Sequence, residues 1–161
     1  MSILQKLFSR TVYPLYAPMA GRAVPVTEVP DPAFSGGLLG KGIAIIPTDG
    51  RVYAPCDATV DVVFTTGHAV SLIADFGAEI LIHVGLSVTA RDSRFFTACA
   101  QSGQKVRRGE LLIEVDLPAA TGAGLDLTTP MLVTNASEYA QIQVHTGTDV
   151  TNLDVAVQLA K

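Results

Sequence analysis

The sequence predicts an all-β fold, an antiparallel β-sandwich or flattened barrel with one or two short helical turns. Its apolar residues fall in short runs that either alternate with polar residues or continue without a break. These runs are rich in Val and Ile and are bounded by Gly, Pro, Asp or Asn, as is typical of strands separated by turns. Helical periodicity is scarce, so a sandwich is favoured over a helical domain.

Several runs have the character of strands. They are Ile43–Ile46, Thr59–Phe64, Ala69–Ala74, Glu79–His83, Leu111–Val115, Met131–Thr134 and Asp154–Leu159. The clearest helical pattern covers Ser93–Gln101, and Gly103 is expected to end that helix as a C-cap residue. The segment Gly103–Gly109 is predicted to form a turn that leads into the strand at 111–115.

A short sequence motif occurs twice, which suggests that the domain has two related halves. Tyr16-Ala17-Pro18 begins one segment, and Tyr53-Ala54-Pro55 begins another. Each triplet leads through a short turn into a strand. Two copies are too few for a solenoid, but they fit a sandwich built from two related motifs.

A chain of 161 residues is expected to fold as one domain with a substantial core. We assign residues 1–15 to an N-terminal tail and residues 16–161 to this single domain. The tail has the pattern of a short amphipathic helix, because its apolar residues share one face and Lys6 and Arg10 lie opposite. Two interpretations stay open: a frayed segment packed on the domain, or a weak contact of residues 1–10 with an anionic membrane surface.

Charge and cysteine content exclude some partners and compartments. The net charge is −4, and the short basic cluster Lys105, Arg107 and Arg108 is interpreted as a solvated turn, so nucleic acid is not an expected partner. Cys56 and Cys99 form no CxxC pair. Two lone thiols in a chain without a secretory signal predict a cytoplasmic protein.

Two of the three histidines are predicted to meet. His68 follows Thr66-Gly67 and opens one strand, His83 ends the next strand, and Asp75-Phe76-Gly77 has the composition of a hairpin turn. If the strands pair around that turn, the two histidines lie opposite or nearly opposite each other. Directly opposed side chains have their Cβ atoms about 4.5–5.5 Å apart, so both rings can address one group.

An imidazole pair of this kind suits phosphoryl transfer. A neutral imidazole is nucleophilic near pH 7, and the hydrogen bond at one ring nitrogen decides which nitrogen attacks. The second ring can donate to a phosphoryl oxygen as charge spreads in the transition state. Thr66 could orient that second ring, His68, through its hydroxyl group.

Other interpretations of the pair stay open. His68 and His83 could be two ordinary histidines on neighbouring strands. They could also hold a zinc ion, although a stable zinc site needs a third or fourth ligand and no nearby residue is convincingly placed to supply one. His145 has no motif around it and is expected at the surface.

The motifs along the chain resemble, in order, those of a known family. They are Ala17-Pro18 with Gly21; Val29-Pro30-Asp31 with Phe34; Gly40 and Gly42-Ile43-Ala44-Ile45 with Pro47; Ala54-Pro55; Thr66 with His68-Ala69; His83-Val84-Gly85-Leu86; Gly103-Gln104-Lys105-Val106 with Gly109; Asp116-Leu117; Thr129-Pro130; and Thr134-Asn135. Together they resemble the glucose-type enzyme IIA component, or glucose permease IIA domain, of the bacterial phosphoenolpyruvate-dependent sugar phosphotransferase system.

The resemblance implies an antiparallel sandwich of the duplicated hybrid motif type with a shallow apolar depression. It implies a phosphotransferase in which His83 receives a phosphoryl group from the histidine-containing phosphocarrier protein and passes it to a cysteine of enzyme IIB for sugar uptake. His68 would stabilise the phosphoryl group, with Thr66 behind it, and no cofactor is required. The residues implied at the docking face are Phe34, Asp31, Val84 and Gly85.

The sequence departs from the family pattern near the docking face. Ser87-Val88-Thr89 stands where the family commonly has Asp-Thr-Val, and Ser93-Arg94-Phe95-Phe96 replaces Gly-Glu-Gly-Phe. Ser137 stands at a usually acidic position, and Ala58 replaces a usual glycine. Acidic groups on a docking face speed the encounter with a basic partner, so the replacements at Ser87 and Ser137 predict an altered partner surface around an intact histidine pair.

Two further functions are carried as alternatives. One is a regulatory protein-binding module that docks on its targets according to its phosphorylation state. The other is a zinc-dependent hydrolase on a related sandwich. Such hydrolases need a carboxylate ligand and a His-x-His pair, and this chain has no His-x-His.

Overall fold

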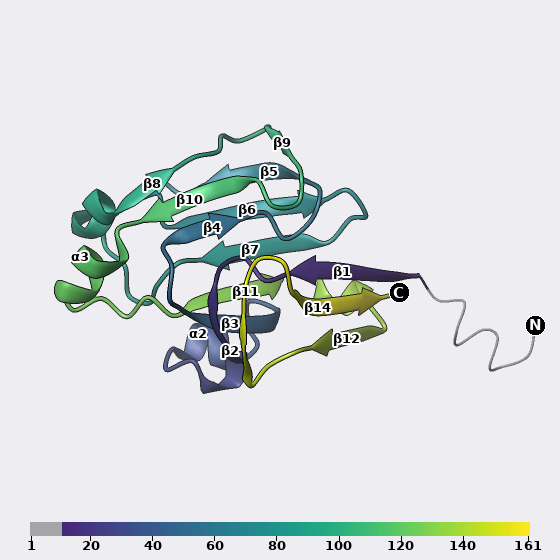
Figure 1. The fold of residues 1–161 in the computed structure, drawn as a ribbon. Helices are drawn as coiled ribbons and strands as arrows, with labels where there is room; N and C mark the ends of the chain where they lie inside the picture. Colours follow the sequence, from purple (N-terminus) through teal and green to yellow (C-terminus); the bar gives the residue numbers. More distant parts are fainter. Residues whose placement is uncertain (1–10) are drawn as a thin grey trace, which may run out of the picture.

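The computed structural model describes residues 11–161, and it confirms the expected antiparallel β-sandwich (Figure 1). One sheet has eight strands in the order β13-β2-β3-β11-β7-β6-β5-β9, and two smaller sheets have the orders β1-β14-β12 and β4-β10-β8. The eight strands of the large sheet are β2 (Gly21–Pro25), β3 (Lys41–Pro47), β5 (Ala58–Val63), β6 (Ala69–Ala74), β7 (Glu79–His83), β9 (Lys105–Val106), β11 (Thr129–Val133) and β13 (Thr148–Val150).

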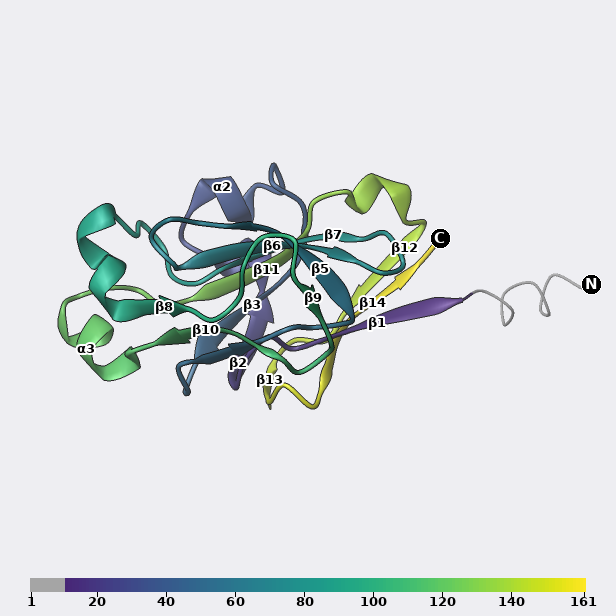
Figure 2. The same cartoon turned by 90° about the horizontal axis from the view of Figure 1, so that it is seen from above.

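The smaller sheets and the helical turns complete the fold. The strands of these sheets are β1 (Val12–Tyr16), β4 (Arg51–Tyr53), β8 (Phe96–Ala98), β10 (Leu111–Val115), β12 (Gln141–Val144) and β14 (Val155–Ala160). The helical segments are η1 (Val26–Glu28), α2 (Pro32–Ser35), η2 (Ala90–Phe95), α3 (Leu117–Gly122) and η3 (Ala136–Glu138). Seen from above, α3 lies at the end of the molecule away from the C-terminus, and α2 lies on one side (Figure 2).

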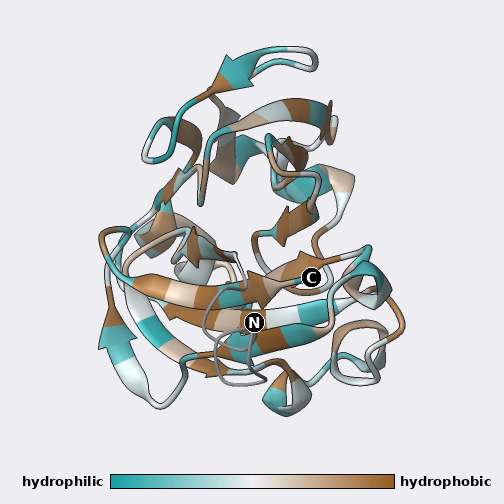
Figure 3. Ribbon diagram, turned by 90° about the vertical axis from the view of Figure 1, so that its right-hand side faces the viewer, coloured by the Kyte–Doolittle hydropathy of each residue, from teal (hydrophilic) through white to brown (hydrophobic). Residues whose placement is uncertain are grey.

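One continuous core joins the three sheets. Leu15 from β1, Ile113 from β10 and Ile80 from β7 are almost completely buried in the same cluster. Apolar and polar residues alternate along many of the strands (Figure 3), which is the pattern of a sheet with one face packed and one face solvated. A separate, smaller core lies under α2 and supports the histidine site. Its buried members are Val29, Phe34, Ala44, Leu86 and Leu132.

Every strand expected from the sequence is present, with ends that shift by no more than two residues. The expected helix at Ser93–Gln101 is wrong. Its first residues belong to η2, and Phe96–Ala98 forms strand β8, which pairs with β10. Cross-strand pairing of an aromatic residue such as Phe96 outweighs a weak helical pattern. Gly103 therefore ends no helix and lies in a turn at φ +85°.

The N-terminal boundary also differs from the expected one. Residues 12–15 belong to β1, which pairs antiparallel with β14, and so they are part of the folded domain. The amphipathic pattern at residues 1–10 lies outside the described residues. The sequence gives little sign of β1, because Pro14 interrupts its apolar run.

The repeated Tyr-Ala-Pro motif is also seen in the structure. The backbone N–H of Tyr16 donates to the carbonyl of Pro55 at 2.9 Å, and the N–H of Tyr53 donates to the carbonyl of Pro18 at 2.7 Å. The two Tyr-Ala-Pro triplets therefore exchange equivalent hydrogen bonds. This reciprocal contact fits a sandwich built from two related motifs.

The hairpin that carries the histidines differs from expectation by one residue in register. Ala69, and not His68, pairs with His83, and the N–H of Val84 donates to the carbonyl of His68 at 2.7 Å. The cause is a three-residue loop centred on Phe76, closed by a hydrogen bond from Ala74 N–H to the Ala78 carbonyl. His68 thus lies just before β6, next to the end of β7.

Candidate functional site

Two backbone features place the histidine rings. His83 is the last residue of β7, a strand held on both sides by β6 and β11. His68 ends a tight turn in which the Gly67 N–H donates to the Phe64 carbonyl at 2.8 Å and the Phe64 N–H donates to the Ala69 carbonyl at 3.0 Å. Gly67 has φ +77°, a conformation that glycine adopts without strain.

The structure brings His68 and His83 together. Their Nε2 atoms are 3.3 Å apart, and the ring planes are nearly perpendicular, at 88°, with centroids 4.7 Å apart. His68 is only 6% exposed, whereas His83 is partly open to solvent. A group arriving from outside therefore meets His83 first, with His68 behind it.

The hydrogen bonds of the site assign a tautomer to each ring. His83 Nδ1 lies 2.8 Å from the carbonyl oxygen of Gly85, which can only accept, so Nδ1 carries the proton and Nε2 keeps its lone pair. For the two Nε2 atoms to bond, His68 Nε2 must then be the donor. His68 Nδ1 is in consequence an acceptor, and the hydroxyl of Thr66 donates to it.

Aromatic side chains enclose the pair. Phe34 lies 5.1 Å from the His83 ring, and Phe96 lies 5.9 Å from the His68 ring, both measured between centroids. Phe64 contacts both rings edge-on, at 5.7 Å from His68 and 6.4 Å from His83. These apolar walls remove water from the rings and limit their rotation.

Burial favours the neutral form of both imidazoles. Burial, reinforced by the neighbouring His83, lowers the pKa of His68 to about 4. Burial also lowers the pKa of His83, although the hydrogen bond to Gly85 and the carboxylate of Asp31 act in the opposite direction. A neutral His83 with a free Nε2 is the nucleophilic form of this ring.

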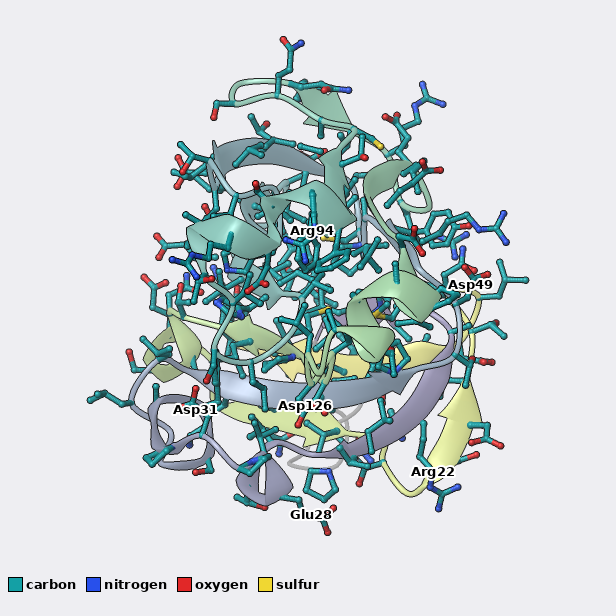
Figure 4. All side chains as sticks on the ribbon, turned by 90° about the vertical axis from the view of Figure 1, so that its left-hand side faces the viewer. Arg22, Glu28, Asp31, Asp49, Arg94 and Asp126 are labelled. Carbon is teal, nitrogen blue, oxygen red and sulfur yellow. The ribbon has the colours of Figure 1, made fainter. Side chains whose placement is uncertain are left out.

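The helical turn α2 supports His83 from one side. Asp31 caps it by accepting a hydrogen bond from the N–H of Ala33 at 3.0 Å, and Pro32 fits its first turn. Phe34 is 5% exposed and packs against Leu86 in the smaller core. Asp31 is partly exposed and is labelled in Figure 4.

The expected docking residues are only partly at the surface. Phe34, Val84 and Gly85 are buried, so they position His83 and offer little area to a partner in this conformation. Asp31 alone of the four is accessible. The exposed apolar residue beside the rings is Phe64, at 38%. The sequence signal for Phe64 is its place at the end of an expected strand, four residues before His68.

Both replaced acidic positions are exposed. Ser87 has φ +55°, which is uncommon for a residue other than glycine, and it follows the site residues Gly85 and Leu86. Ser137 lies in η3. Ser87 contributes no charge next to the pair. Ser137 follows Asn135, which bonds to Glu79 at the opposite end of β7 from His83, so the expectation that Ser137 alters the surface around the pair is not supported.

The remaining candidate residues lie apart from this site. His145 is partly buried, not fully at the surface, and its Nε2 bonds to Gln158 Oε1 at 3.2 Å. Cys56 is buried, Cys99 is exposed, and both are free thiols; burial raises the pKa of Cys56 to about 12. Arg108 stacks on Tyr16, with 4.0 Å between its guanidinium carbon and the ring centroid, and is thus more than a solvated turn residue.

Metal-ligating side chains are few around the pair. Within residues 11–161, no group of three or more His, Cys, Asp or Glu side chains is arranged to hold a metal ion. His68 and His83 supply two nitrogen ligands at most. In the same part of the chain, no helix has the length and apolar content needed to cross a membrane.

Comparisons with known proteins agree with the fold and identify a family. Residues 13–139 match the family described as phosphoenolpyruvate-dependent sugar phosphotransferase system, EIIA 1. The chain is 47% identical over 129 residues to the beta-glucoside-specific EIIBCA component of this system from Dickeya chrysanthemi, covering 80% of this chain and 20% of that protein. It is 35% identical over 130 residues to the glucose-specific EIIA component of Staphylococcus epidermidis, covering 81% and 78%.

A solved structure is also similar. Glucose permease IIA from Mycoplasma capricolum superposes with a TM-score of 0.83 at 29% sequence identity, over 92% of this chain and 96% of that chain. The chain spans about one fifth of the length of the EIIBCA relatives that it matches, and most of the length of the separate EIIA component.

Fold, histidine pair and comparisons together define a phosphotransferase of the kind that works through a phosphohistidine. The chain belongs to the EIIA 1 family of the phosphoenolpyruvate-dependent sugar phosphotransferase system, as a glucose-type EIIA domain.

Proposed function

We propose that His83 accepts a phosphoryl group from the histidine-containing phosphocarrier protein and passes it to a cysteine of an enzyme IIB domain for sugar uptake. The observation that carries this proposal is the pair of Nε2 atoms 3.3 Å apart, with the proton of His83 held on Nδ1 by Gly85. His83 Nε2 therefore carries no proton. Its lone pair accepts from His68 Nε2–H in the unphosphorylated site and can attack phosphorus once that hydrogen bond shifts to a phosphoryl oxygen.

The acceptance step needs no proton transfer at His83. Its Nε2 attacks phosphorus, a P–N bond forms, and the P–N bond to the donor's histidine breaks, with the electron pair leaving on the donor's ring nitrogen. The His83 ring then carries a proton on Nδ1 and the phosphoryl group on Nε2, and so becomes formally cationic. The Gly85 carbonyl, 2.8 Å from Nδ1, stabilises that charge.

His68 acts as the hydrogen-bond donor of the pair. Its Nε2–H donates to His83 Nε2 in the unphosphorylated site, and Thr66 holds its other nitrogen. We expect the same N–H to donate to a phosphoryl oxygen once His83 is phosphorylated. A donor fixed before the reaction stabilises the charge that spreads over these oxygens. In the second step a thiolate attacks phosphorus, the P–N bond breaks, and His83 returns to its neutral form.

We propose that this reaction takes place in the cytoplasm. The identity of the sugar is a separate question. The relatives are named for beta-glucosides and for glucose, although they share this domain. We therefore propose that the partner domains, and not this domain, select the sugar.

Phosphorylation assays test the proposal. The protein is incubated with phosphoenolpyruvate, enzyme I and the phosphocarrier protein, and acid-labile label is measured. We expect label on the wild type and on His145→Gln, the remote histidine control, and no label on His83→Gln. The His68→Gln variant should be labelled more slowly than the wild type, because the donor fixed by Thr66 is lost. Label that persists in His83→Gln would contradict the assignment.

A regulatory role of the same face is a second candidate. Phe64 is exposed and lies against both rings, so a charged phosphoryl group on His83 changes the surface beside an apolar side chain on which a partner would dock. We expect regulatory targets to bind the unphosphorylated form more tightly. Equal binding of both forms in a titration of candidate transporters would exclude this role.

Zinc binding by His68 and His83 is a third proposal, and it is supported only by the distance between their Nε2 atoms. Two nitrogens that bind one tetrahedral zinc ion at about 2.0–2.1 Å stand about 3.3 Å apart, which is close to the observed Nε2 separation. Because the described residues offer only these two ligands, we propose that zinc binds here only when a partner supplies the others. Stoichiometric zinc and hydrolase activity in the isolated protein would instead favour a zinc-dependent hydrolase.

A further inference from the structure

The peptide unit between Gly85 and Leu86 is held at both ends. Its carbonyl oxygen accepts from His83 Nδ1 at 2.8 Å, and its N–H donates to the carbonyl of Asp126 at 2.8 Å. Because a trans peptide is planar, its C=O and N–H point in opposite directions, and fixing one fixes the other. The Asp126 carbonyl therefore determines where the acceptor for the His83 proton lies.

Further backbone contacts join Gly85 and Leu86 to residues 126–128. The N–H of Gly85 donates to the carbonyl of Thr128 at 3.2 Å, and Leu86 forms an antiparallel bridge with Asp126. Gly85 has φ +89°, and a Cβ at this position would lie 3.2 Å from the Asp126 carbonyl oxygen. The close approach of residues 126–128 to the chain after His83 thus depends on a glycine.

The side chain of Asp126 fixes the conformation of its own segment. Its Oδ1 accepts from the N–H of Thr128 at 3.0 Å and from the hydroxyl of Thr128 at 2.6 Å. This is the pattern of an Asx-turn, in which a carboxylate replaces a backbone acceptor. The segment lies between α3 and β11, outside the strand ladder, and Asp126 is exposed (Figure 4).

We propose that Asp126 is a positioning residue for His83. Its carboxylate holds residues 126–128 in the turn that aims two carbonyls at the backbone N–H groups of Gly85 and Leu86. Through the Gly85 carbonyl, that turn keeps the His83 proton on Nδ1 and the lone pair on Nε2. Hydrogen bonds linked in series polarise one another, so loosening the outer one weakens the inner one.

The inference rests on the proposed function only for its effect on phosphoryl transfer. Removal of an outer hydrogen-bond partner of a functional histidine costs about 10- to 100-fold at metal sites. We expect Asp126→Ala to lower the rate of phosphoryl acceptance about tenfold, at the low end of that range, because the backbone ties remain. Asp126→Asn keeps an oxygen acceptor for Thr128 and should restore most of the rate.

Asp154 provides a matched control. Its Oδ2 accepts from the N–H of Thr151 at 2.8 Å and from the hydroxyl at 3.4 Å, so this carboxylate also bonds to both groups of a nearby threonine, in the loop before β14. Asp154→Ala should lose these two hydrogen bonds and leave phosphoryl acceptance unchanged. Similar unfolding midpoints for Asp126→Ala and Asp154→Ala would show that a difference in rate is not a loss of fold.

The ring nitrogens of His83 give a readout that a purely structural role would not move. In unphosphorylated protein with ¹⁵N-labelled histidine, the wild type should show a protonated Nδ1 and a free Nε2, and Asp126→Ala should show a mixture of tautomers. Wild-type ring shifts together with a wild-type rate in Asp126→Ala would overturn the inference. A wild type that accepts no phosphoryl group would contradict the proposed function, while the ring shifts would still test Asp126.

Discussion

The Nε2 atoms of His68 and His83 face each other at 3.3 Å, while the Nδ1 atoms are held by separate partners, the hydroxyl of Thr66 and the carbonyl of Gly85. One ring therefore presents a lone pair and the other a proton. In the phosphoryl transfer that we propose, the two histidines therefore have different parts, although their side chains are identical. The tautomers differ because the Nδ1 atom of His68 contacts a hydroxyl that can donate, whereas the Nδ1 atom of His83 contacts a carbonyl that can only accept.

The pH dependence of stability should report on His68. Its pKa is about 4 in the folded protein and about 6.5 in an unfolded chain, so between these values only the unfolded chain binds the proton. The free energy of unfolding should fall as the pH drops from about 6.5 to 4, by roughly 2 kcal/mol after allowance for solvent near the pair. Urea unfolding at a series of pH values measures it.

The His68→Gln variant isolates this effect from that of the carboxylates, which also destabilise the protein in acid. Its stability should fall less steeply than that of the wild type over the same range. Parallel curves for the two proteins would show that His68 is not held neutral by burial.

The hydroxyl of Thr66 should be needed for fast transfer. Thr66→Val keeps the shape of the side chain but removes the donor to His68 Nδ1, so the His68 ring can turn or change tautomer. We expect the rate of transfer from His83 to an enzyme IIB domain to fall about tenfold, as for the loss of one buried hydrogen bond. Thr66→Ser should recover the rate; in single-turnover measurements, equal rates for Val and Ser would refute the role.

Phe34 should contribute more to stability than to docking. The side chain is 5% exposed and fills the smaller core beside Leu86 and Leu132. Phe34→Ala should lower the free energy of unfolding by about 3 kcal/mol, the usual cost of such a cavity. A loss below about 1 kcal/mol in urea unfolding would mean that the ring is not packed as described.

A carboxylate at position 87 should speed the encounter with a basic partner. Ser87 is exposed at φ +55°, which Asp and Asn tolerate better than most residues. Ser87→Asp should raise the association rate with the phosphocarrier protein, and added salt should reduce the gain. Ser87→Asn is the uncharged control, and an equal gain for Asn would show that charge is not the cause.

Local patterns in the sequence predicted much of the fold. The strands at 69–74 and 79–83 have their expected bounds, because the alternation and the Asp-x-Gly turn lie within one hairpin. The histidine pair follows from that hairpin, with a register error of one residue that comes from the three-residue loop around Phe76. The first strand, β1, was not predicted because Pro14 lies in its middle.

The rest of the site depends on contacts between distant segments. Phe96 reaches His68 only because β8 pairs with β10, and no local pattern in the sequence predicts that pairing. Asp126 approaches Gly85 across a gap of some forty residues in the chain, through backbone groups that carry no residue-specific signal. Phe34 is likewise buried in the smaller core and Val84 in the main core, and neither burial follows from the neighbours in sequence.

The state of the phosphorylated histidine tests the central claim most directly. Protein with ¹⁵N-labelled histidine is phosphorylated by the phosphocarrier protein and examined by ³¹P and ¹⁵N NMR, with His83→Gln and His145→Gln for assignment. We predict one phosphohistidine, at Nε2 of His83, with Nδ1 still protonated. A phosphoryl group on Nδ1 of His83, on His68 or on His145 would contradict the claim.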